Sequence, residues 1–101
     1  MVSANAQAGI RLETRRQLRK LGYNFRDIRF MMDACDSDLM DAAVAQSGQA
    51  DALAAAEANA AASGGTFATI VAAIIAFLQS PQGQALIAAL IKLLIASLSG
   101  A

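Results

Sequence analysis

Basic side chains near the N-terminus are the residues whose types and spacing most clearly suggest chemistry. Arg11, Arg15 and Arg19 recur every four residues, so they share one face of a helix. The basic residues of this region are Arg11, Arg15, Arg16, Arg19, Lys20, Arg26 and Arg29. Such a cluster binds phosphate, on lipid headgroups or on nucleic acid, or it contacts an acidic protein partner. The simplest alternative is a solvated helix face that pairs with the acidic residues between positions 33 and 57.

The distribution of charge separates the chain into segments. The net charge is zero, but the basic residues come first, acidic residues follow, and after Glu57 only Lys92 is charged. Such asymmetry suggests different partners for different segments. Nucleic acid is the partner that the basic cluster supports least, because the cluster is short and has no interleaved aromatic side chains.

No combination of residues points to catalysis or to a metal site. The chain has no histidine, and its single cysteine, Cys35, excludes an intrachain disulfide. The aspartates between positions 33 and 41 lack the glycine and the closing glutamate of a calcium loop, so helix capping and solvation explain them better. A nucleophile elbow, a phosphate-binding loop and a dinucleotide fingerprint are also missing. We therefore expect a protein that is not an enzyme and needs no cofactor.

Helical spacing predicts short amphipathic helices in the N-terminal half. After a polar lead-in over residues 1–9, a helix from about Ile10 should end before Gly22. Asn24 suits the N-cap of the next helix, and residues 36–38 can end that helix and start another. The apolar stripe of the second helix is Phe25, Ile28, Met31, Met32 and Cys35. The alanine-rich residues 42–62 favour helix, with breaks near Gly48 and residues 63–65.

The C-terminal third predicts a hydrophobic helical hairpin. Two apolar segments, residues 66–78 and 85–98, flank a polar turn at residues 79–84. Ser80 followed by Pro81 is typical of a helix start, and Gly83 belongs to the same turn. Extended through neighbouring uncharged residues, each segment reaches about 20 residues, the length that spans a bilayer.

Small and large side chains occupy opposite faces of the two expected helices. The small residues suit close helix–helix packing: Gly65, Ala68, Ala72, Ala76, Ala85, Ala89 and Ala96. The bulky rows would then face lipid: Phe67, Ile70, Ile74, Phe77, Leu86, Leu90, Leu93 and Leu94. Lys92 is the only charged residue of the two apolar segments. If it lay near the middle of a membrane, it would contact a partner, line an aqueous path or reach a headgroup. In a segment that lies in the interface it would face water.

These features predict an all-α protein in two parts. A polar and charged helical head covers residues 1–57, and the hydrophobic hairpin covers residues 58–101. With its basic residues 11–29 and its hairpin over residues 66–98, the layout resembles the small membrane proteins of tailless phages that have an internal lipid layer. The resemblance implies a structural protein whose partners are a bilayer and other protein subunits, located in a virion membrane. An accessory subunit of a bacterial inner-membrane complex has the same layout.

Two further functions fit the same sequence. One is a membrane-permeabilising protein of the holin or pore-forming kind, which Lys92 on the small-residue face would support. The other is a soluble oligomer that buries the apolar hairpins of several copies in a shared core. In a cell membrane, the excess of basic residues would place the head on the cytoplasmic side.

Overall fold

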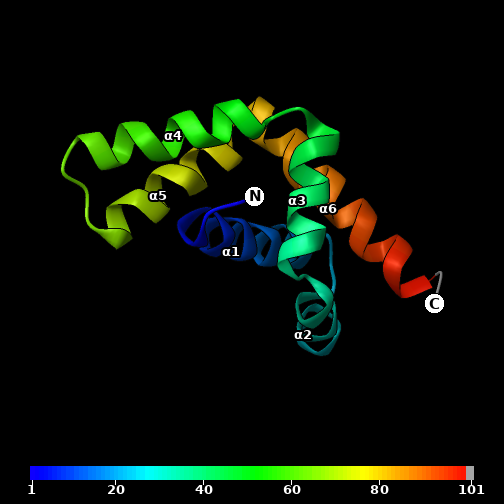
Figure 1. Cartoon of the computed structure of the whole chain (residues 1–101). Coiled ribbons are helices and arrows are strands. Elements are labelled where there is room, and N and C mark those ends of the chain that lie inside the picture. Colours follow the sequence, from blue (N-terminus) through cyan, green and yellow to red (C-terminus); the bar gives the residue numbers. More distant parts are fainter. Residues whose placement is uncertain (100–101) are drawn as a thin grey trace.

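Helices make up most of the part of the chain that the structure describes. The computed structural model describes residues 1–99 (Figure 1). Its helices are α1 (Ala4–Lys20), α2 (Phe25–Ala34), α3 (Ser37–Ser47), α4 (Ala50–Ala62), α5 (Phe67–Leu78) and α6 (Pro81–Ser99). No strand occurs in residues 1–99, so the all-α prediction is confirmed.

Polar side chains cap the starts of α2 and α3 at the predicted positions. The Asn24 side-chain oxygen accepts a hydrogen bond of 2.8 Å from the backbone N–H of Asp27. The Asp36 carboxylate accepts one of 2.9 Å from the backbone N–H of Leu39. Each bond satisfies one of the backbone donors that a helix N-terminus leaves unpaired.

The first helix is longer than predicted. Ser3 caps it by accepting from the backbone N–H of Ala6 at 3.1 Å, and α1 is helical from Ala4. The polar lead-in over residues 1–9 was therefore a wrong prediction. Alanine and glutamine are strong helix formers, so one capping serine is enough to extend the helix backwards. The other end agrees with prediction, because Leu21 caps the helix and Gly22 follows with a φ of +98°.

A break after α4 interrupts the first of the two expected membrane spans. Helix α4 ends at Ala62 and α5 begins only at Phe67, after a loop in which Gly64 has a φ of +78°. Gly65 lies in this loop, so the prediction that it packs on a helix face was wrong. Helix α5 has 12 residues, which is too few to cross a bilayer alone.

The turn between α5 and α6 lies where the sequence predicted. Helix α6 begins at Pro81. The Ser80 hydroxyl donates to the carbonyl of Phe77 at 2.5 Å and accepts from the backbone N–H of Gly83 at 3.2 Å. A β-carbon on Gly83 would overlap the Phe77 carbonyl oxygen and the α-carbon of Leu78. The turn is therefore this tight because position 83 has no side chain.

A closely packed hairpin is not confirmed, because α5 and α6 diverge from their turn. In Figure 1, α5 runs back between α1 and α4, whereas α6 passes behind α3 toward the C-terminus. Helix α6 packs mainly against α3, and α5 packs mainly against α1 and α4. Residues of the predicted head and of the predicted hairpin thus share one hydrophobic core.

The bulky rows of α5 and α6 face this core and not the outside. Side chains with no exposed surface include Ile74, Leu78, Leu86, Leu90 and Leu94, together with Ile10 and Leu18 of α1. Phe67 keeps the predicted outward position, at 62% exposed. Apart from Phe67, the large rows point into the protein in this structure, and their contact with lipid in a bilayer stays a prediction.

The small residues lie at the surface instead. Ala68, Ala72, Ala76, Ala85 and Ala96 are exposed, and Ala89 is half-buried. They therefore do not join α5 to α6, although packing of this face against another chain stays a prediction. Burial of a leucine or isoleucine contributes more than burial of an alanine. The N-terminal helices supply an apolar surface, and the larger side chains are buried against it in preference to the alanines.

Candidate functional site

A buried carboxylate sits at the centre of the basic helix. Glu13 of α1 is 1% exposed. It accepts hydrogen bonds from Arg16 at 2.9 and 3.0 Å and from Gln17 at 2.9 Å, and Gln79 at the end of α5 donates to it at 3.3 Å. Burial alone raises the pKa of Glu13, but these hydrogen bonds outweigh burial and hold its pKa below the ordinary value. Glu13 in turn raises the pKa of Arg16.

Arg11 is also engaged inside the protein. Its guanidinium donates to the carbonyl of Cys35 at 2.5 Å and to the carbonyl of Met32 at 3.1 Å. These carbonyls lie at the C-terminal end of α2, where a cation is favourable. Arg11 and Arg16 therefore each have a partner within the protein.

Cys35 is buried beneath this contact. It is 1% exposed and belongs to the hydrophobic core, as its place on the apolar stripe predicted. Burial raises the pKa of the Cys35 thiol. The thiolate is the reactive form of cysteine, so this side chain is protected in the folded protein.

Three other arginines meet in a pocket between α1 and α2. Arg15 and Arg19 lie one turn apart on α1, and Arg29 comes from α2. The pocket has a volume of about 530 Å³. Its lining is Arg15, Arg19, Tyr23, Phe25, Ile28, Arg29, Met32 and Asp33. We call it the arginine pocket.

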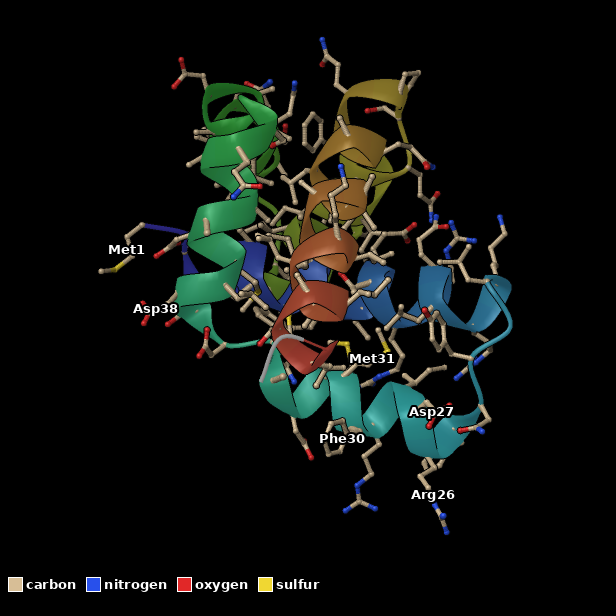
Figure 2. All side chains as sticks on the ribbon, turned by 90° about the vertical axis from the view of Figure 1, so that its right-hand side faces the viewer. Met1, Arg26, Asp27, Phe30, Met31 and Asp38 are labelled. Atoms are coloured by element: carbon tan, nitrogen blue, oxygen red, sulfur yellow. The ribbon has the colours of Figure 1, made fainter. Side chains whose placement is uncertain are left out.

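Lys20 and Arg26 are exposed outside the arginine pocket. Figure 2 shows Arg26 projecting from the outer side of α2, as Phe30 does, whereas Met31 points toward the body of the protein. The seven basic residues of the predicted cluster thus divide into three groups. Two have structural partners, three line the arginine pocket, and two lie on the open surface.

Lys92 lies on the exposed side of α6. It lines a groove of about 360 Å³ with Ile87, Ile91 and Ile95 of α6, with Gln17 of α1 and with Leu21, which follows α1. Within residues 1–99 the one ion pair joins Arg16 to Glu13, so Lys92 has no acidic partner there. The roles that the sequence suggested for Lys92 at a bilayer stay predictions.

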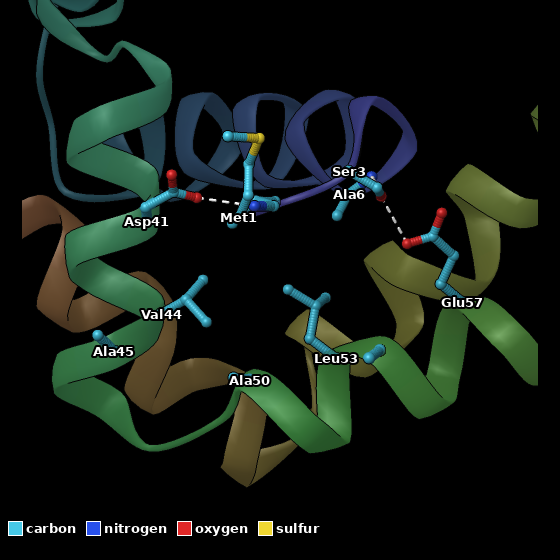
Figure 3. A pocket seen from close by; sticks show the side chains of 11 residues that line it. Met1, Ser3, Ala6, Asp41, Val44, Ala45, Ala50, Leu53 and Glu57 are labelled. Atoms are coloured by element: carbon cyan, nitrogen blue, oxygen red, sulfur yellow. Dashed lines mark hydrogen bonds between the residues drawn. The ribbon is translucent and has the colours of Figure 1, made fainter.

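The N-terminus is fastened across a third cavity, of about 320 Å³, between α3 and α4 (Figure 3). The backbone N–H of Val2 donates to Asp41 at 2.8 Å, and the Ser3 hydroxyl donates to Glu57 at 2.6 Å. Asp41 and Glu57 therefore hold the start of the chain in place, and we assign this cavity a structural role.

Comparison with known proteins adds no family. No protein-family model matches this sequence, and no curated protein or solved structure is significantly similar to it. The function must therefore be argued from the chain itself. In residues 1–99 no group of three or more side chains is placed to hold a metal ion.

Sequence reasoning found the arginines but missed how they divide. The spacing of Arg15 and Arg19 placed them on one helix face, and nothing local placed Arg29 opposite them. The signal that could have helped was the length of the loop, because the short connection at residues 21–24 makes α1 and α2 neighbours. The contact between Glu13 and Gln79 joins residues 66 positions apart and had no local signal.

Proposed function

We propose that the protein is a non-enzymatic structural or assembly protein that attaches other protein subunits to a bilayer. The observation that carries the proposal is α6. It is the one helix in residues 1–99 that is long and apolar enough to cross a membrane, over Pro81–Leu98. Only 28% of that window is buried inside the protein, whereas the core helix of a soluble protein is mostly buried.

Insertion of α6 would require part of the bundle to open. Leu86, Leu90 and Leu94 have no exposed surface, and α6 packs mainly against α3. Hydrocarbon and a protein core are both apolar surroundings for these leucines. We propose that lipid replaces α3 as their cover when the protein meets a bilayer, while α1 and α2 stay at the headgroups.

The same proposal assigns the remaining surface to protein partners. In a virion with an internal membrane the partner would be the shell, and in a bacterial inner membrane it would be a membrane complex. The exposed alanine face of α5 and α6 suits close approach of another helix.

Membrane fractionation with an alkaline carbonate wash tests the proposal directly. The full chain, produced in bacteria, should stay in the membrane pellet after the wash, and crosslinking from the exposed Lys20 should capture neighbouring subunits. A chain that carbonate releases, or that never enters the membrane fraction, would refute membrane integration.

A protein that is soluble without lipid is the second candidate, and the burial of the bulky rows within the chain favours it. Ile74, Leu86, Leu90 and Leu94 are enclosed by the chain's own helices, so the monomer already covers its largest apolar side chains without lipid. A chain of this kind would be soluble without detergent, and size-exclusion chromatography with light scattering would distinguish a monomer from an oligomer with a shared core. Release of dye from loaded vesicles would instead favour the membrane-permeabilising alternative.

A further inference from the structure

We propose that the arginine pocket binds the phosphate of an anionic phospholipid headgroup. This inference rests on the proposed function, because it names the lipid chemistry that a membrane-attached protein of this fold would recognise. It concerns α1 and α2 alone and does not require α6 to insert.

The charges in the pocket favour an anion. Arg15, Arg19 and Arg29 line it together with one acid, Asp33. In residues 1–99 none of these arginines forms an ion pair or a side-chain hydrogen bond with the protein, in contrast to Arg11 and Arg16. Guanidinium groups bind phosphate oxygens through charge-assisted and often paired hydrogen bonds. A phosphate would also relieve the repulsion between these cations.

The walls of the pocket favour a lipid over a soluble phosphate. Beside the three arginines, the lining includes the apolar side chains of Phe25, Ile28 and Met32. Phe25 is 76% exposed although it begins the apolar stripe of α2. A free phosphate has no group to place against this apolar wall, whereas a phospholipid carries glycerol and acyl carbons next to its phosphate.

The outer side of α2 repeats this combination. Phe30 is 65% exposed and projects outward, as Arg26 does (Figure 2). Exposed aromatic side chains among arginines are typical of helices that lie in the membrane interface. In this arrangement the Phe25 and Phe30 rings enter the boundary between headgroups and acyl chains, and the pocket opens onto the phosphate layer.

The chain supplies its own probe for the pocket. Tyr23 is the only tyrosine and there is no tryptophan, so the intrinsic fluorescence of the protein reports on a residue of the pocket lining. We expect vesicles of phosphatidylcholine mixed with phosphatidylglycerol to change the Tyr23 emission and to carry the protein in flotation. Vesicles of phosphatidylcholine alone should do neither.

Substitution of the pocket arginines tests the assignment. Arg15→Gln and Arg29→Gln should each weaken binding to the mixed vesicles about fivefold, because one cation near an anionic surface contributes about that factor. Lys20→Gln removes the same charge outside the pocket and should weaken binding clearly less. All three side chains are exposed, so unchanged thermal unfolding by circular dichroism would show that the variants fold.

Several outcomes would overturn the proposal. Equal losses for the pocket and control variants would show that diffuse surface charge binds the vesicles. Saturation of the Tyr23 change by soluble glycerol phosphate at similar concentration would assign the pocket to a free phosphate. Arginine-dependent binding of an oligonucleotide with no binding of vesicles would assign it to nucleic acid. Carbonate-resistant membrane association without any effect of Arg15→Gln or Arg29→Gln would refute the pocket while leaving the proposed function intact.

Discussion

The amide of Gln79 donates a hydrogen bond of 3.3 Å to the buried carboxylate of Glu13, across 66 positions of sequence. Glu13 lies in the middle of α1, and Gln79 lies at the turn from α5 into α6. This contact fixes the turn against the basic helix. It adds a polar contact between the N-terminal and C-terminal parts of the bundle, which also share one hydrophobic core.

Acidification should weaken the folded protein through Glu13. Its pKa in the folded protein lies below the ordinary value of 4.5, so its contribution to stability is complete above pH 4.5 and is lost as the pH falls through the depressed folded pKa. Urea unfolding followed by circular dichroism should therefore show a falling free energy of unfolding below pH 4.5. The Glu13→Gln variant should show a shallower fall, because the remaining slope comes only from other acids. Identical slopes in both proteins would contradict the prediction.

The crossing of α1 and α5 should depend on Gly9. A β-carbon built on Gly9 would lie 2.6 Å from Cγ2 of Ile74, which is fully buried. Gly9→Ala should therefore lower the free energy of unfolding by about 1–2 kcal/mol, since the cost of overpacking exceeds the gain in helix propensity.

A second substitution separates these two effects. In an Ile74→Ala background the obstructing methyl is gone, so Gly9→Ala should become neutral or stabilising. A double-mutant cycle measured by thermal and urea unfolding gives the coupling between the two positions. No coupling would mean that α1 and α5 do not cross at this point.

Neighbouring positions on α6 should respond differently to truncation in water. Leu94 has no exposed surface, whereas Ile95 is 43% exposed. Leu94→Ala should lower the free energy of unfolding by about 2–5 kcal/mol, the usual range for a buried leucine, and Ile95→Ala should cost clearly less. Equal costs, or a larger cost at Ile95, would mean that the bulky row of α6 is not buried against the protein in solution.

Local chemistry made much of the secondary structure predictable. The caps at Asn24, Asp36 and Ser80 are polar residues next to apolar periodic segments, and each starts a helix as expected. Such signals act over three or four residues, so the sequence contains them in full. The missed start of α1 depended on Ser3, which precedes a segment with no apolar periodicity of its own.

The facing of α5 and α6 was not predictable in the same way. Each helix has a small-residue face and a bulky face, and either could be buried, depending on whether lipid or protein covers the other. In the structure, the helices α1, α3 and α4, which are distant in sequence, determine which face is buried, because they pack over Ile74 and Leu94. The arginine pocket is likewise a product of two helices, although the residues on each were evident from spacing.

Cys35 should report whether the bundle opens on a membrane. It is the only cysteine, it is buried in the same core as Leu90, and burial raises the pKa of its thiol. In buffer we expect slow labelling by a water-soluble maleimide, because the reagent cannot reach the buried Cys35 side chain and little of its thiol is in the thiolate form. If α6 inserts by leaving α3, vesicles that contain phosphatidylglycerol should accelerate labelling of Cys35, because the core that shields it is then disrupted.

A relocated cysteine distinguishes opening from a general effect of vesicles. In a Cys35→Ala/Asn59→Cys protein the thiol would sit at an exposed position of α4, so vesicles should not accelerate its labelling. Acceleration at position 35 alone would show that the N-terminal helices release α6 at the bilayer. Full protection of Cys35 in vesicle-bound protein would show the opposite, namely that the intact bundle docks through α2 and the arginine pocket while Leu86, Leu90 and Leu94 stay covered by the protein.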